Sequence, residues 1–220
     1  MATWRPITLS LTNRWGPLPP HADDRPPRRG LARLERLLLA VGVICVGAWM
    51  YVSLEAALYQ RLEDRELDAV LRSKTASAAT VSSPTTPQRL AAGTVIGRVE
   101  IPRLGVSTIV RVGTDARTLR LAVGHIEGTA LPGQVGNVGL AGHRDTFFRR
   151  LRDIRSGDSI RVVTPGGTFT YRVARTDVVW PSDVWVLDDT EEPVLTLVTC
   201  YPFSYVGSAP QRFIVRAELL

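Results

Sequence analysis

Short apolar runs, several of them alternating with polar positions, fill the chain from residue 93 to its end. Runs of this length, bounded by Gly, Pro and Asp, predict β-strands rather than helices. The expected strands are residues 94–101, 106–110, 137–142, 159–164, 168–179, 194–199 and 212–219. Two brief helices are expected at residues 115–121 and 146–151. This pattern predicts an all-β domain with short helices, either a closed barrel of seven to eight strands or a sandwich.

A different pattern covers residues 37–54, which are 18 uncharged and mostly apolar residues in succession. As a helix they would be about 27 Å long, close to the thickness of the bilayer hydrocarbon. A core helix would normally show a polar stripe, and none is present. A cleaved signal peptide fits less well, because 36 residues precede the run, although Glu55-Ala56-Ala57 keeps that alternative open. The pattern predicts a single N-terminal transmembrane anchor over residues 37–57.

The charges on the two sides of this run predict its orientation. Residues 1–36 are rich in proline and carry seven arginines against three acidic residues, as expected of a basic, mostly disordered cytoplasmic tail. Acidic residues follow the run, and residues 58–92 read as a charged helical stalk and a flexible linker. A short coiled coil in the stalk stays open. The expected protein is single-pass in the plasma (inner) membrane, with residues 93–220 as the extracytoplasmic domain.

Charge and ligand counts narrow the function classes. The net charge is +6, but residues 93–220 carry 15 basic and 13 acidic side chains, so most of the excess lies in the tail. The excess of basic residues does not lie in the expected folded domain, and the sequence shows no nucleic-acid-binding motif. Both observations argue against nucleic acid as a partner. With two cysteines and three histidines in the chain, a metalloenzyme or a disulfide scaffold is also disfavoured.

Three residues of the expected barrel carry candidate chemistry. Cys200 ends an apolar strand, and a lone thiol outside the cytoplasm is exposed to oxidation, so its presence needs a reason. Taken alone, Cys200 fits a small buried side chain as well as a functional thiol. His143 lies in a loop after a strand, and Arg212 opens the last strand. If residues 194–199 and 212–219 pair as an antiparallel hairpin, Cys200 faces Arg212. Together the three form a plausible nucleophile, proton carrier and oxyanion stabiliser.

Three segments carry a family resemblance. TLVTC at 196–200, GNVGLAGHRDTFF at 136–148 and PQRFIVRAEL at 210–219 resemble the Cys, His and Arg segments of sortases, the cysteine transpeptidases of bacterial surfaces. The likeness covers residues 93–220 in order and is strongest to class D. It implies a sortase-like β-barrel in which Cys200 is the nucleophile, His143 protonates the leaving amine and Arg212 stabilises the oxyanion.

The resemblance also implies a reaction and its partners. The enzyme would be a membrane-anchored transpeptidase of the thiol protease type. It would cleave an LPxTG-like sorting signal of a surface protein through a Cys200 thioacyl intermediate. An amine acceptor of the cell envelope, a peptidoglycan precursor or a pilin lysine, would then take the acyl group. Two alternatives stay open, namely a hydrolytic thiol peptidase of the same fold, which places the enzyme among hydrolases, and a non-enzymatic anchored β-domain.

Four further residues are expected beside the substrate. Thr199 precedes the nucleophile, and Tyr201 and Phe203 follow it in an aromatic loop that would wall a peptide groove. His125 lies in a segment that resembles a second sortase motif, where shaping the loop beside the active site is favoured over a proton-transfer role in place of His143.

No cofactor or metal is expected. Some sortases bind calcium near the loop that corresponds to residues 181–193, and this loop contains several acidic residues. Their spacing is not that of an EF-hand, which favours a solvated acidic loop.

Overall fold

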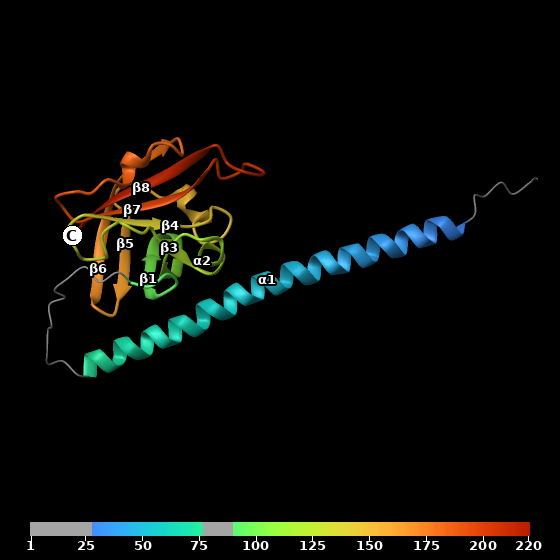
Figure 1. Ribbon diagram of the computed structural model, residues 1–220, viewed down its shortest axis with the longest axis horizontal. Coiled ribbons are helices and arrows are strands. Elements are labelled where there is room, and N and C mark those ends of the chain that lie inside the picture. Colours follow the sequence, from blue (N-terminus) through green and yellow to red (C-terminus); the bar gives the residue numbers. More distant parts are fainter. Residues whose placement is uncertain (1–27, 77–89) are drawn as a thin grey trace, which may run out of the picture. The chain divides into compact units, whose positions relative to one another are not determined.

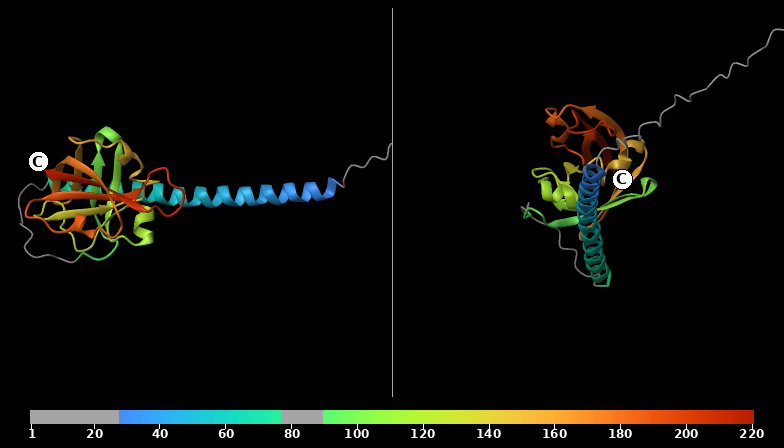
Figure 2. Two further views of the ribbon diagram at one scale, coloured as in Figure 1. Left: turned by 90° about the horizontal axis from the view of Figure 1, so that it is seen from above. Right: turned by 90° about the vertical axis from the view of Figure 1, so that its right-hand side faces the viewer.

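A computed structural model describes residues 28–76 and 90–220 (Figures 1 and 2). The predictions for residues 1–27 of the tail and 77–89 of the linker lie outside the described residues. The chain divides into two units, the first ending at Gly47 and the second running from Ala48 to Leu220.

The N-terminal helix α1 (Arg28–Ala76) is continuous through the expected anchor and the charged segment behind it. Residues 28–36, assigned to the disordered tail from sequence, are helical instead. Most of them are strong helix formers, and two prolines, which disfavour helix, directly precede them. Within the described parts of the chain, α1 is the one helix long and apolar enough to cross a membrane, with a mean hydropathy of 2.3 over an unburied window.

Eight strands form a closed barrel in the order β1-β2-β3-β4-β7-β8-β6-β5, in which β5 pairs back onto β1 (Figure 1). The strands are β1 (Val95–Ile101), β2 (Val106–Val112), β3 (Val123–His125), β4 (Asn137–Ala141), β5 (Ser159–Thr164), β6 (Gly167–Val179), β7 (Val194–Tyr201) and β8 (Gln211–Leu219). The short helices are η1 (Pro102–Leu104), α2 (Ala116–Leu121), η2 (Arg149–Asp153) and η3 (Val184–Leu187). The predicted all-β barrel of seven to eight strands is therefore confirmed.

The strand β3 and the 3-10 helix η2 are among the elements that differ from the sequence-based prediction. β3 was not expected, because three residues with a central glycine show no readable alternation. It lies between β2, to which it is parallel, and β4, to which it is antiparallel, and so closes the wall between them. The helix expected at 146–151 is the 3-10 helix η2, which begins three residues later than predicted.

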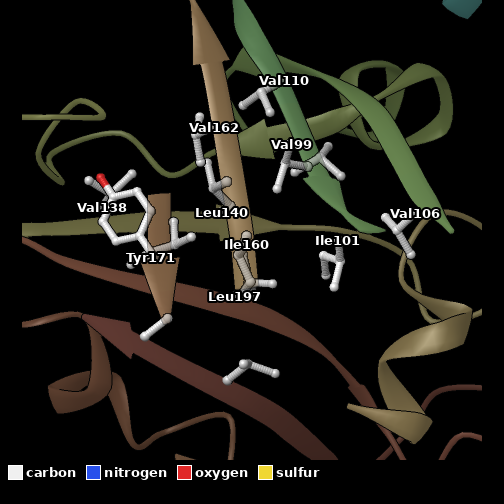
Figure 3. Packing of buried hydrophobic residues seen from close by; sticks show 14 of the residues in the cluster. Val99, Ile101, Val106, Val110, Val138, Leu140, Ile160, Val162, Tyr171 and Leu197 are labelled. Carbon is white, nitrogen blue, oxygen red and sulfur yellow. The ribbon is translucent and has the colours of Figure 1, made fainter. Parts of the chain in front are cut away.

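The barrel interior is filled by apolar side chains from all parts of the wall. Figure 3 shows Val99, Leu140, Ile160 and Leu197 pointing into the same space from different strands, and none of the four exposes surface. Tyr171 lies among them, and its hydroxyl accepts a hydrogen bond from the backbone N–H of Gly133 at 3.3 Å. This core fixes the strand register, because a one-residue slip would turn every inward side chain outward.

Within the second unit, the later part of α1 contacts the barrel through side chains. The Gln60 amide donates to the carbonyl of Leu121 at 2.6 Å and accepts from the backbone N–H of Ile109 at 2.9 Å. Arg98 on β1 pairs with Asp64 and Asp68 of α1 at 3.3 and 3.1 Å. Gln60 thereby continues the backbone hydrogen bonding at one end of the short β2–β3 pair.

Candidate active site

The pairing of β7 and β8 brings the cysteine and the arginine together. The strands are antiparallel, and their register places Cys200 directly opposite Arg212. Side chains of opposite residues in an antiparallel pair lie on the same face with Cβ atoms about 5 Å apart. A thiol and a permanent cation therefore share one position of the sheet, as the hairpin argument from sequence predicted.

This position lies on the outer face of the barrel. Leu195 and Leu197 belong to the interior core, so alternation along β7 directs the next even-numbered side chains, Val198 and Cys200, outward. Cys200 is partly exposed and is a free thiol. Its side chain is therefore accessible to a substrate without any opening of the barrel.

His143 leaves β4 at the level of Cys200. β4 is parallel to β7, with Ala141 paired to Val198, and the N–H of Gly142 continues the ladder to the Val198 carbonyl at 3.1 Å. Two residues farther along each strand are His143 and Cys200. The exposed His143 then enters a tight turn in which its carbonyl accepts from the N–H of Phe148 at 3.1 Å.

Thr199 holds these two strand ends together. Its hydroxyl donates to the carbonyl of Gly142 at 2.7 Å, and the residue is 2% exposed. Because neighbouring residues in a strand point to opposite faces, Thr199 points inward where Cys200 points outward. The contact fits the role of orienting the nucleophile segment, and a direct contact with substrate stays a prediction.

Arg212 is oriented by its own chain. One guanidinium nitrogen, Nη1, donates to the carbonyls of Ala209 at 3.2 Å and Gln211 at 2.9 Å. Ala209 lies at the end of the loop that connects β7 to β8, and Gln211 is the first residue of β8. The guanidinium is thus tied to the loop end at the level of Cys200, which suits a fixed positive charge beside a developing oxyanion.

The aromatic residues after Cys200 form a packed cluster. The rings of Tyr201 and Phe203 meet edge to face with centroids 6.0 Å apart, and each also packs against Phe213, at 6.2 and 5.3 Å respectively. All three are half-buried, and Phe203 and Phe213 pack against the interior core. The cluster holds the start of the β7–β8 loop on the barrel, while its predicted contact with a peptide stays a prediction.

His125 lies apart from this group. It ends β3, where its register partner is Leu140, which in turn pairs with Leu197 of β7. Along β7, Leu197 lies three residues before Cys200, and its side chain faces the barrel interior. His125 is 4% exposed, and its Nε2–H donates to the carbonyl of Ala130 at 2.8 Å. The geometry supports the interpretation that His125 shapes the loop after β3, and leaves His143 as the histidine level with the thiol.

Burial gives His125 a pH signature. Desolvation lowers its pKa, against smaller opposing contributions from the Ala130 carbonyl and Glu127. The unfolded chain then takes up a proton below about pH 6.5, whereas the folded protein does so only at lower pH, so the contribution of His125 to folding stability is complete above that pH and falls as the pH drops.

We expect the urea midpoint of the wild-type protein to fall between pH 7.5 and pH 5, and the fall to be smaller in His125→Gln, which retains an N–H donor. The measurement is equilibrium unfolding at both pH values. An equal fall of the urea midpoint in the wild-type protein and in His125→Gln would show that folding does not lower the pKa of His125.

The acidic loop before β7 is fastened over the outer face of the sheet. The buried Asn137 amide donates to the carbonyls of Val186 and Asp188 at 3.0 and 3.1 Å, and accepts from the Thr196 hydroxyl at 2.7 Å. Among the described residues, no group of three or more His, Cys, Asp or Glu side chains is arranged to hold a metal ion.

Two residues that organise the site were not predicted from sequence. Asn137 fastens η3 to β4 and β7, and Arg144 holds the loop between Cys200 and Arg212. Arg144 directly follows His143 in the chain, so its place beside a candidate site residue could be read from the sequence. Its partners lie 58 to 63 residues away, and the sequence carries no sign of them.

Known proteins resemble this chain in sequence and in fold. A family model described as the sortase domain matches residues 99–220. The chain is 40% identical over 124 residues to Sortase D of Bacillus subtilis, covering 56% of this chain and 63% of that protein. It is 29% identical over 129 residues to a Sortase A of Listeria monocytogenes, covering 57% of this chain and 56% of that protein. The chain thus spans less than two thirds of the length of either relative.

Solved structures give the same result. A sortase D5 transpeptidase of Clostridium perfringens is 28% identical with a TM-score of 0.60, over 76% of this chain and 99% of that one. A sortase C of Clostridium perfringens with the C-terminal cell wall sorting motif is 25% identical with a TM-score of 0.55, over 71% of this chain and 86% of that one.

Proposed function

The chain belongs to the sortase family, and from this premise we propose that it is a membrane-anchored cysteine transpeptidase with Cys200 as nucleophile. The observation that carries the proposal is the β7–β8 register, which sets Cys200 opposite Arg212 on the outer face of the barrel. His143 leaves the neighbouring strand at the same level. A nucleophile, a proton carrier and an oxyanion stabiliser are the three groups that acyl transfer requires.

In the proposed reaction the Cys200 thiolate attacks the carbonyl carbon of the scissile peptide bond, and the C–S bond forms. Arg212 stabilises the oxyanion of the tetrahedral intermediate. His143, as imidazolium, gives its proton to the leaving amine as the C–N bond breaks, which leaves a thioester on Cys200. An incoming amine then attacks the thioester, His143 takes the proton from that amine, and the thiolate is released.

The substrate class follows from the family and from one solved relative. The sortase C of Clostridium perfringens was solved with a C-terminal cell wall sorting motif. We infer an LPxTG-like sorting signal as acyl donor for this chain, and an amine of a peptidoglycan precursor or a pilin lysine as acceptor. Water in place of the amine would give a thiol peptidase, which the same three side chains support equally well.

The anchor fits a substrate at the membrane. The apolar window of α1 is long enough to span a bilayer, and the arginines of the N-terminal segment favour a cytoplasmic N-terminus. The barrel would then act on the extracytoplasmic side, where surface proteins that carry sorting signals and the amine acceptors of the cell envelope are found.

Intact-mass measurement of the full chain in detergent micelles tests the proposal. The protein is incubated with LPxTG-like peptides, with and without hydroxylamine or an amine acceptor. We expect a thioacyl adduct and amine-dependent release of product. Cys200→Ala should form no adduct, whereas Cys45→Ala, which removes the exposed thiol of α1, should react as wild type.

The remaining outcomes separate the alternatives. An adduct released equally fast by water alone would favour the peptidase. A folded protein that forms no adduct with any peptide, and whose Cys200 ignores a thiol reagent, would contradict both enzymatic readings and favour the anchored β-domain.

A further inference from the structure

Arg144 is a buried cation that holds one loop by three of its carbonyls. The residue is 6% exposed. Its Nη1 donates to the carbonyl of Pro202 at 2.8 Å, and its Nη2 donates to those of Tyr205 and Gly207 at 2.6 and 2.8 Å. Asp145 lies 3.4 Å from Nε and balances part of the charge.

The loop that Arg144 holds joins the other two members of the site. It leaves β7 directly after Cys200 and Tyr201 and enters β8 at Gln211, one residue before Arg212. Its conformation therefore decides how the ends of β7 and β8 are presented. Arg144 itself is the next residue after His143, so its backbone moves with that of the histidine.

His143 is consequently fixed from both sides. On its N-terminal side, the Gly142 carbonyl accepts from the Thr199 hydroxyl, and on its C-terminal side, Arg144 grips the β7–β8 loop. Both ties run to the segment that carries Cys200. Hydrogen bonds on both sides of His143 restrict the shift and the rotation of its backbone more than a hydrogen bond on one side would.

The energetics favour a strong and specific contact. Hydrogen bonds from a charged donor are stronger than those between neutral groups, and a buried guanidinium without partners would be costly. Only the planar guanidinium fork presents donors in several fixed directions at once, whereas a lysine ammonium is a point donor on a flexible stem. A lysine at this position keeps the charge but not the three-carbonyl geometry.

We propose that Arg144 is a positioning residue, which sets the distance between His143 and the Cys200–Arg212 pair by clamping the β7–β8 loop. The inference rests on the proposed function for the roles of those three residues. Arg144 itself contacts no reacting atom in this scheme, because its guanidinium donors are turned to the loop carbonyls.

The test compares Arg144→Met and Arg144→Lys with Arg149→Met, which changes an exposed arginine on η2. In a Cys45→Ala background, two quantities are measured: kcat and KM of thioacyl formation, and the pH profile of Cys200 alkylation by iodoacetamide. We expect Arg144→Met to lower kcat about 10²-fold, as small misplacements of catalytic groups do, with KM nearly unchanged. In Arg144→Met the pH profile of Cys200 alkylation should also shift. Arg144→Lys should recover part of the loss in kcat and part of the shift in the profile. Arg149→Met should match the Cys45→Ala parent in both measurements.

A merely structural role would lower the melting temperature but leave kcat per folded molecule and the alkylation profile unchanged, and that result would overturn the proposal. Should Arg144→Met fail to fold, Arg144→Lys supplies both readouts, and parent values there would overturn the proposal equally. If no peptide acylates the parent protein, the proposed function fails, while the alkylation profiles still decide the role of Arg144.

Discussion

Changing Arg212 to lysine is expected to lower kcat/KM for thioacyl formation about 10²- to 10³-fold, the range found when one oxyanion-stabilising donor is removed. The β7–β8 register places Arg212 opposite Cys200, and the carbonyls of Ala209 and Gln211 fix the orientation of its guanidinium. Lysine keeps the positive charge but presents no fork, so it cannot contact both the loop carbonyls and the oxyanion. The loss should appear mainly in kcat, because the oxyanion exists only in the transition state and the intermediate.

Strand β8 offers a matched control for this experiment. Arg216 lies on the same strand and the same face as Arg212, four residues farther on and opposite Thr196. Arg216→Lys should leave kcat/KM within about twofold of wild type, as expected of a change outside the site. Equal losses in the two variants would assign the effect to the strand or to general charge. An unchanged Arg212→Lys would show that the oxyanion is stabilised elsewhere.

The barrel strands were largely readable from the sequence, because inward and outward positions alternate on a half-buried sheet. The segment 159–164 was predicted with the bounds it has in the structure, and β6 and β8 differ by one residue at one end. β3 was not predicted because a strand of three residues is too short to show the alternation of inward and outward positions. Its place in the sheet depends on partners in β2 and β4, which local sequence does not specify.

The candidate site divides in the same way. Cys200 and Arg212 could be paired from sequence, because two consecutive strands joined by a loop have a simple antiparallel register. His143 could be selected from its place in a loop after a strand, but its level relative to Cys200 depends on a parallel pairing between β4 and β7, more than fifty residues apart, which the local sequence does not show. Arg144 and Asn137 look like ordinary polar residues until their distant carbonyl partners are known.

The second large effect is expected at His143, where replacement by glutamine should slow acylation by a peptide about 10²- to 10⁴-fold, the usual contribution of general acid–base catalysis. An amine leaves an acyl intermediate only when it is protonated, and His143 is the histidine level with Cys200. The measurement is single-turnover thioacyl formation at pH 7.5. His125→Gln is the matched control, since that histidine is buried on the interior side of the barrel and its loss should reduce stability rather than rate.

The leaving group separates the role of His143 from that of Arg212. A thioester substrate with the same acyl peptide expels a thiolate of pKa about 8.5, which needs no proton to depart. With this substrate the loss in His143→Gln should shrink by an order of magnitude or more, whereas the loss in Arg212→Lys should persist, because the tetrahedral oxyanion forms in both reactions. If His143→Gln lost as much on the thioester as on the peptide, His143 would be acting on the Cys200 thiolate and not on the departing amine.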